Sequence, residues 1–470
     1  MLRLVLALAL TLLATAAPAM PPQVARALER AGIAPDAVAL YVQPIDAAEP
    51  VLSVNAGRPM NPASVMKLVT AFAVLERLGP GHTWTTRIAL DGPLREGRLD
   101  GSLYLVGSGD PLLDVGRLWR VLARVRAAGI RHIAGDVVLD ASALRLPPHD
   151  PAAFDSRPLR PYNSGPSGLL LNFNTVHLLL TPGRTGETLT VAPVPALDGL
   201  QIDNRITTTG GRCQTWFRDL DAALDWTPDG PRLTLTGSMP ADCGVREWAV
   251  SPFTSDDFAA ALVAWLWRES GGSLGGRVRH GTTPDTAATL FEHVSPSSAE
   301  AVREMNKWSS NVIAQQLLAT LGADQPDASD MLAAGARVAA ETLAAAGIPT
   351  QGLILDNGSG LSRIASVRAD TLGALLLAAW QRPWMPEFIS ALSLAGIDGT
   401  ARRRLTDSPA HGHAHIKTGT INGVRAMAGY VLDRNGRRHA VVMMVNDAKA
   451  PLSEAAQDAL IEWVWGGAGR

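Results

Sequence analysis

Lysine is rare in this chain, so the positions that keep it are informative. The sequence contains 42 lysines and arginines. Only four of these residues are lysines: Lys67, Lys307, Lys417 and Lys449. An arginine keeps its proton in a protein, whereas the pKa of a lysine can be lowered until its amine acts as a base. The lysines that lie close to serine or threonine are therefore the first candidates for chemistry.

The first such pattern is Ser64 and Lys67, three residues apart at the start of the apolar run 65–75. On a helix these two side chains share one face, and a helix that is apolar on all sides is buried. A serine hydroxyl becomes a nucleophile when a base removes its proton. A buried lysine near other cations has a lowered pKa and could be that base. The alternative is a surface serine beside a lysine that extends into solvent.

A second pattern, Ser309 and Asn311, follows two residues after Lys307. Taken alone, it is typical of a helix N-cap or a polar turn. In a catalytic site, the hydroxyl of Ser309 could contact both Lys67 and Lys417 and relay a proton to a leaving amine. The amide of Asn311 could hold a substrate carbonyl.

The third pattern is the Lys-Thr-Gly-Thr sequence that begins at Lys417, which we expect to open a strand beside the site. Gly419 lets a substrate backbone lie close because it has no Cβ. Lys417 supplies positive charge, and the hydroxyls of Thr418 and Thr420 can bind a carboxylate. Two backbone N–H groups, those of Ser64 and Thr420, are the expected donors to an oxyanion.

The surrounding elements predict an α/β (α+β) fold. Strands are expected near both ends of the chain, within 38–55 and 427–446, and the two hairpins can join in one antiparallel sheet. Helices are expected between them, including a long one over 298–320.

The middle of the chain differs, because short β-type runs dominate it. We therefore predict a discontinuous catalytic domain, 20–85 and 290–470, and a β-rich insertion of one or two modules, 86–289. The insertion contains both cysteines, Cys213 and Cys243.

Residues 1–19 are predicted to be an export signal, because Arg3 precedes the apolar run 4–13 and small residues follow it. That run is too short to span a bilayer; an uncleaved anchor is the alternative. After cleavage we expect no stable membrane insertion. The formal net charge of −2 gives no electrostatic reason to expect nucleic acid as a partner. The short basic run 402–404 is expected to be solvated surface.

An even pair of cysteines in an exported protein favours a disulfide, here between Cys213 and Cys243. Two buried free thiols are the alternative. No metal is expected, since two cysteines without a nearby histidine pair do not complete a tetrahedral site. No glycine-rich phosphate loop is present, and no cofactor is expected.

In this order, Ser-x-x-Lys, Ser-x-Asn and Lys-Thr-Gly form the signature of the penicillin-recognising serine enzymes. The chain resembles the class C low-molecular-mass penicillin-binding proteins, the D-alanyl-D-alanine carboxypeptidases/endopeptidases of peptidoglycan. A long insertion between the first two motifs marks that family, and here Ser64 and Ser309 are far apart in sequence. Five further stretches match the family: 107–111, 305–307, 358–363, 396–400 and 428–430.

The resemblance implies a penicillin-binding transpeptidase-like fold and a periplasmic enzyme that acts on peptidoglycan stem peptides and crosslinks through an acyl-enzyme on Ser64. It implies that β-lactam antibiotics acylate the same serine. The residues it assigns to catalysis are Ser64, Lys67, Ser309, Asn311 and Lys417, and those it assigns to substrate binding are Thr418, Gly419 and Thr420.

Two positions extend or depart from that pattern. Arg363 is a hypothetical contact for a diaminopimelate-type carboxylate, and a structural arginine in a loop is the alternative. Ser310 stands where the family usually has aspartate. That aspartate does not carry the proton, so we expect activity to survive.

Two rival functions remain open. A β-lactamase would use the same machinery, although the long insertion argues against it. A catalytically silent peptidoglycan-binding protein would belong to a different class, although every motif residue is present.

Overall fold

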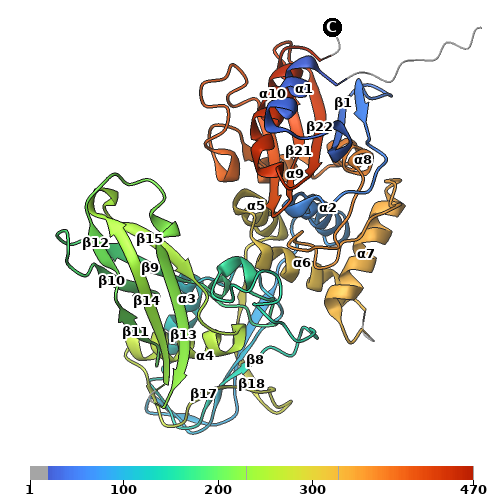
Figure 1. Ribbon diagram of the computed structural model, residues 1–470. Coiled ribbons are helices and arrows are strands. Elements are labelled where there is room, and N and C mark those ends of the chain that lie inside the picture. The colour runs from blue at the N-terminus through green and yellow to red at the C-terminus, as the bar shows by residue number, and fades with distance from the viewer. Residues whose placement is uncertain (1–19, 229, 326–327, 469–470) are drawn as a thin grey trace, which may run out of the picture.

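The computed structural model describes residues 20–228, 230–325 and 328–468. The predicted export signal, 1–19, lies outside the described residues. Figure 1 shows two lobes, one built from both ends of the chain and one built from its middle. Within the described residues, no helix combines the length and the apolar character that crossing a bilayer requires.

A six-stranded antiparallel sheet forms the centre of the first lobe, in the order β19-β20-β21-β22-β1-β2. Near the N-terminus, β1 pairs with the C-terminal strand β22, with Val38 opposite Val445. The predicted union of the two terminal hairpins is therefore confirmed, and so is the α/β (α+β) class. The strands are β1 (Val38–Pro44), β2 (Leu52–Val54), β19 (Ser393–Leu394), β20 (Ala414–Ile421), β21 (Val424–Leu432) and β22 (Arg438–Asn446).

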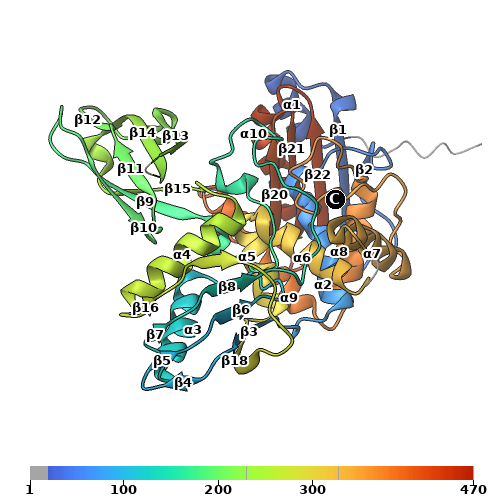
Figure 2. The same ribbon diagram turned by 90° about the horizontal axis from the view of Figure 1, so that it is seen from below.

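Helices cover both faces of this sheet (Figures 1 and 2). On one face, α1 (Pro22–Ala31) and α10 (Glu454–Trp465) share a buried core with the sheet. The other face packs against a helical layer around α2 (Lys67–Arg77). The rest of that layer is α5 (Ser298–Trp308), α6 (Asn311–Ala323), α7 (Met331–Ala345), α8 (Ala369–Trp380) and α9 (Met385–Ala391).

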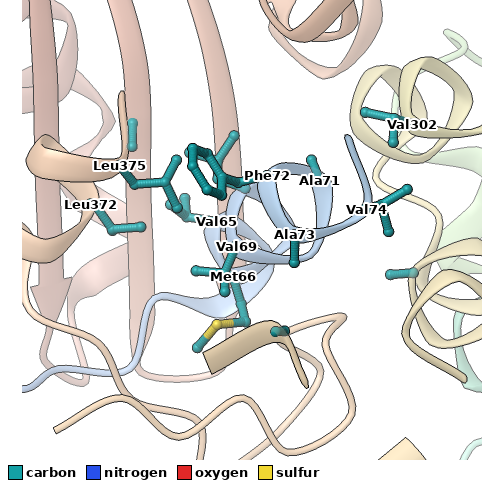
Figure 3. Close-up of a cluster of buried hydrophobic side chains, with 14 of the residues drawn as sticks. Val65, Met66, Val69, Ala71, Phe72, Ala73, Val74, Val302, Leu372 and Leu375 are labelled. Atoms are coloured by element: carbon teal, nitrogen blue, oxygen red, sulfur yellow. The ribbon is translucent and has the colours of Figure 1, made fainter. Parts of the chain in front are cut away.

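The helix α2 is the centre of that layer, because almost all of it is apolar and buried. Figure 3 shows Phe72 directed toward Leu375 of α8, while Val74 lies on the opposite side, toward Val302 of α5. Burial of this kind contributes about 1.5–3 kcal/mol for each large apolar side chain. The packing fixes the position of the turn that precedes α2.

The prediction of one long helix over 298–320 is wrong, because the structure has two helices there. The first, α5, ends at Trp308, and the backbone of the next residue, Ser309, is left-handed (φ 59°, ψ 35°). Ser310 then caps the second, α6, by accepting a hydrogen bond from the backbone N–H of Ile313 at 3.4 Å. Serine and aspartate are both favourable N-caps, so Ser310 can fill the local role of the aspartate that the family usually has there.

The second lobe begins and ends with two paired strands, β3 (Thr85–Leu90) and β18 (Ala288–Val294), at the edge of a five-stranded sheet. The sheet order is β17-β8-β6-β3-β18. The pairing of β3 with β18 supports our proposal that 86–289 is one insertion. The other strands of this sheet are β6 (Leu103–Val106), β8 (Val137–Asp140) and β17 (Val278–His280).

Two helices, α3 (Val115–Ala127) and α4 (Ser255–Glu269), share a buried core with the sheets of this lobe. A small sheet combines β4 (Leu94–Arg95), β5 (Arg98–Leu99), β7 (His132–Ile133) and β16 (Ser273–Leu274). A further sheet combines β9 (Val176–Thr181), β10 (Thr190–Val194) and β15 (Arg246–Val250). The last combines β11 (Gln201–Asn204), β12 (Thr207–Thr209), β13 (Leu220–Thr227) and β14 (Gly230–Pro240).

A disulfide joins Cys213 to Cys243 within this lobe. It closes a segment of 30 residues. Replacing both cysteines by serine should lower the free energy of unfolding of the insertion by about 3–4 kcal/mol, because the unfolded chain regains the entropy that the crosslink removes. Denaturant unfolding of the two proteins measures the difference. Unchanged stability would contradict the prediction.

Candidate active site

Ser64 lies in a short 3-10 turn, Ala63–Met66, that leads directly into α2. The turn is tied to the central sheet by two asparagines. The backbone N–H of Asn61 donates to the side chain of Asn446 on β22 at 2.9 Å, and the Asn446 amide donates back to the carbonyl of Asn61 at 2.9 Å. The side chain of Asn61 also accepts from the N–H of Ala63 at 2.9 Å. No motif in the sequence indicated this pair, which holds Ser64 in place.

Lys67 is fully buried, and its Nζ lies 3.2 Å from the Oγ of Ser64. It also donates to the side-chain oxygen of Asn311 at 2.6 Å and to the carbonyl of Ser359 at 2.6 Å. Burial, followed by the charge of nearby Lys417, lowers the pKa of Lys67 well below the ordinary lysine value. A neutral amine can donate its two protons to the oxygens of Asn311 and Ser359. Its lone pair is then free to accept a hydrogen bond from the hydroxyl of Ser64.

The carbonyl of Ser359 is a contact that the sequence did not predict, although 358–363 was one of the matching stretches. The side chain of Asn357 orients it, accepting hydrogen bonds from the N–H and the hydroxyl of Ser359 at 3.0 and 2.8 Å. The next residue, Gly360, has φ +76°, and a Cβ there would lie 1.9 Å from the carbonyl oxygen of Ala63. Only glycine fits so close to the turn that carries Ser64.

The second motif reaches the site from the break between α5 and α6. The Oγ of Ser309 accepts a hydrogen bond from Nζ of Lys417 at 2.9 Å. No hydrogen bond joins Ser309 to Lys67 among the described residues, although we expected contact with both lysines. Asn311 is buried, and its Nδ2 donates to the carbonyl of Tyr162 at 2.9 Å. Its amide is therefore bound to Lys67 and to the insertion rather than free for a substrate carbonyl.

The third motif lies in the middle of β20 rather than at its start. Lys417 is fully buried, and burial lowers its pKa to about 7. Its Nζ donates to the carbonyl of Thr418 at 2.7 Å. A Cβ at Gly419 would lie 2.6 Å from the carbonyl oxygen of Pro62 and 2.9 Å from the nitrogen of Ser64. Gly419 therefore allows β20 to approach the nucleophile turn, which differs from the predicted approach of a substrate.

Ser64, Ser309, Thr418 and Thr420 line one pocket of about 450 Å³. The structure thus brings together three segments that are far apart in sequence. The hydroxyl of Thr418 lies 2.9 Å from that of Thr400, in the matching stretch 396–400.

Of the other positions named from the sequence, Arg404 also lines this pocket, whereas Lys307 and Arg363 do not. Lys307 is buried and forms an ion pair with Asp398 at 2.5 Å, which gives it a structural contact. Arg363 is exposed, and its guanidinium lies over the ring of Phe154, 4.3 Å from the centroid. In the basic run 402–404, Arg404 is only 6% exposed and bonds to Asp458 at the surface of α10, so the expectation of solvated surface is wrong for that residue.

Comparison with known proteins identifies the family. Residues 21–465 match the model of the D-Ala-D-Ala carboxypeptidase 3 (S13) family. The chain belongs to this family. The resemblance inferred from the motifs is therefore confirmed over nearly the whole described chain.

Individual known proteins resemble the chain in sequence or in fold. A D-alanyl-D-alanine carboxypeptidase of Actinomadura sp. (strain R39) is 32% identical over 434 residues, which cover 88% of this chain and 78% of the relative. The crystal structure of penicillin-binding protein 4 (dacB) from Haemophilus influenzae matches with a TM-score of 0.76 at 24% identity, covering 95% of this chain and 100% of that one. Its complex with a β-lactam matches with a TM-score of 0.72 at 23% identity, covering 94% and 99%.

Proposed function

We propose that this S13 protein is an exported, periplasmic serine peptidase that removes the terminal D-Ala from peptidoglycan stem peptides through an acyl-enzyme on Ser64. The observation that carries the proposal is the distance of 3.2 Å between the Oγ of Ser64 and the Nζ of Lys67, an amine whose pKa burial lowers well below the ordinary lysine value. A hydroxyl and a neutral amine at this distance can exchange a proton.

Acylation begins when the Oγ of Ser64 attacks the carbonyl carbon of the penultimate D-Ala while its proton passes to Nζ of Lys67. The backbone N–H groups of Ser64 and Thr420 would stabilise the oxyanion. The C–N bond then breaks as Lys67 gives up this proton, which reaches the leaving amine by way of the hydroxyl of Ser309, itself held by Lys417. Lys67 is then neutral again. Water attacks the ester in the second half, with Lys67 again accepting the proton, and Ser64 is regenerated.

Substrate binding would use the pocket beside Ser64. The hydroxyls of Thr418 and Thr420 line this pocket and could bind the carboxylate of the terminal D-Ala, with Lys417 behind them. Arg363 could contact a diaminopimelate-type carboxylate of the stem peptide, which its exposed position allows.

The same steps would cleave a D-Ala–diaminopimelate crosslink, because the bond broken is again an amide of D-Ala. The pocket volume of about 450 Å³ lies in the range that holds drug-sized ligands, which is more than a single D-Ala requires. We therefore include D,D-endopeptidase activity in the proposal. β-Lactams would acylate Ser64 by the same attack.

A mass spectrum of the mature protein after exposure to penicillin tests the proposal. We expect one covalent adduct, located on the peptide that contains Ser64, together with D-Ala release from a pentapeptide substrate. Absence of any adduct would favour the silent peptidoglycan-binding protein. Rapid hydrolysis of nitrocefin without D-Ala release would favour the β-lactamase.

The pH dependence of acylation provides a further prediction. The neutral form of Lys67 is the active base, and a group with a lowered pKa becomes neutral at lower pH than usual. The rate of acylation by penicillin should therefore rise with pH and reach its plateau far below 10.5, the ordinary lysine value. Stopped-flow acylation across the pH range measures this limb. A rise that continues to the ordinary lysine pKa would contradict a buried, neutral Lys67.

A further inference from the structure

The pocket that contains Ser64 carries more positive charge than the three motifs supply. Besides Ser64 and the two threonines, it is lined by Arg403, Arg404 and Arg425. These arginines come from the segment after 396–400 and from β21. None of them belongs to a predicted site, and none takes part in the proton transfers proposed above.

Arg425 is placed in this pocket by strand register. It lies directly opposite Thr420 in the β20–β21 pair, so the two side chains project from the same face of the sheet. Its side chain is 20% exposed and forms an ion pair with Glu454 at the start of α10. That helix packs beside β21 (Figures 1 and 2). Arg425 is thus held in the pocket beside Thr420.

The three arginines differ in how much of their charge is available. Arg404 forms an ion pair with Asp458, because its Nε and Nη2 both donate to the same carboxylate oxygen. Its Nη1 donates to the side-chain oxygen of Gln457 at 3.2 Å. Arg425 has one carboxylate partner, Glu454, which is 50% exposed and can be displaced. Arg403 is exposed and forms no ion pair with any residue that the structure describes. Arg403 and Arg425 can therefore accept an anionic ligand.

Lys417 cannot offer an anionic ligand the positive charge that Arg403 and Arg425 offer. It is fully buried, and its Nζ is already bonded to Ser309 and to the carbonyl of Thr418. Because burial lowers its pKa to about 7, Lys417 loses its charge near neutral pH. The arginines remain charged at any physiological pH.

We propose that Arg403 and Arg425 form an anion subsite for the leaving side of the substrate, where they bind a second carboxylate beyond the one held by Thr418 and Thr420. A terminal D-Ala has only one carboxylate. The acceptor stem peptide of a crosslink carries additional ones. The subsite would therefore favour the cleavage of crosslinks with acidic acceptor peptides over the release of D-Ala, an inference that rests on the proposed function.

The test compares three substrates: a pentapeptide that releases D-Ala, a crosslinked stem-peptide dimer with free acceptor carboxylates, and the same dimer with those carboxylates amidated except the one beside the cleaved bond. Arg425→Gln should lower kcat/KM for the free dimer about tenfold or more, mainly through KM, because a charge-assisted contact is lost. D-Ala release and cleavage of the amidated dimer should change by less than about threefold. Arg403→Gln should act in the same direction.

Two further variants make the result specific. Glu454→Gln removes the carboxylate that competes for Arg425 and should raise kcat/KM for the free dimer, a gain that misfolding cannot produce. Arg437→Gln, which removes an exposed arginine paired with Asp46 on another part of the sheet, should leave all three rates unchanged.

Equal losses on all three substrates, or no loss on the free dimer, would overturn the subsite. So would a wild-type protein that releases D-Ala but cleaves no dimer, and in that case the proposed carboxypeptidase would stand. A wild-type protein that neither releases D-Ala nor forms a penicillin adduct would overturn both proposals.

Discussion

Replacing Ser64 by alanine should abolish both the covalent penicillin adduct and the release of D-Ala. The variant loses the only hydroxyl that lies within hydrogen-bonding distance of the buried amine of Lys67 among the described residues. The expected loss in kcat is on the order of a millionfold, the size seen when a serine protease loses its nucleophile. Labelled penicillin binding and D-Ala release measure the two activities separately.

The fold should survive this change, because Ser64 lies at the pocket and its neighbours Val65 and Met66 supply the burial. Ser390→Ala is the matched control. Ser390 is exposed, and its hydroxyl donates to the carbonyl of Glu387. Its own carbonyl accepts from Arg303, a bond that alanine keeps, so that variant should retain full activity. If Ser64→Ala still forms the adduct, another residue is the nucleophile and the proposed function is rejected.

The sequence predicted the parts of the site that depend on local spacing. Ser64 and Lys67 had to share one side of the chain, because a helical turn places residues three apart on one face. The union of the N-terminal and C-terminal strands was also predictable. Each hairpin has an apolar alternation or run that needs a partner, and both flank the same set of helices.

The sequence could not predict contacts made by backbone atoms. The carbonyl of Ser359 completes the surroundings of Lys67, yet any residue type supplies a carbonyl, so only the surrounding glycines hinted at a constrained turn. The mutual bonds of Asn61 and Asn446 join residues 385 positions apart and need the folded sheet to be seen. At Gly419 the residue type did indicate a close approach. The atoms that approach it are the carbonyl oxygen of Pro62 and the nitrogen of Ser64, and not those of a substrate.

The break at Ser309 was missed for a different reason. The run 298–320 has no proline or glycine before Gly322, and its apolar spacing continues across the break. Ser309 nevertheless adopts a left-handed conformation, which is uncommon for serine. In return, the hydroxyl of Ser309 reaches Lys417 and the amide of Asn311 reaches Lys67. Tertiary contacts at this candidate site thus outweigh the preference of serine for other backbone conformations. Functional sites are where prediction from local sequence patterns is expected to fail.

Replacing Lys67 by methionine should slow acylation by about 10²–10⁴-fold, the usual contribution of a general base. Methionine has a similar length and no polar atom, so it suits the fully buried position. The proton of Ser64 would then have no acceptor at 3.2 Å. Initial, non-covalent binding of penicillin should change little, because Thr418 and Thr420 are untouched.

The pH profile separates a base from a merely structural lysine. In the wild type the acid limb follows the titration of Lys67, so the small residual rate of Lys67→Met should lose that limb. Lys449→Met is the matched control: this exposed lysine bonds to the carbonyl of Gly32 at 3.2 Å, and its loss should alter neither rate nor profile. If Lys67→Met reacts slowly but keeps the wild-type pH dependence, a different group accepts the proton. If it reacts at the wild-type rate, no base is needed at position 67. Either result would refute the mechanism in which burial of this amine creates the nucleophile.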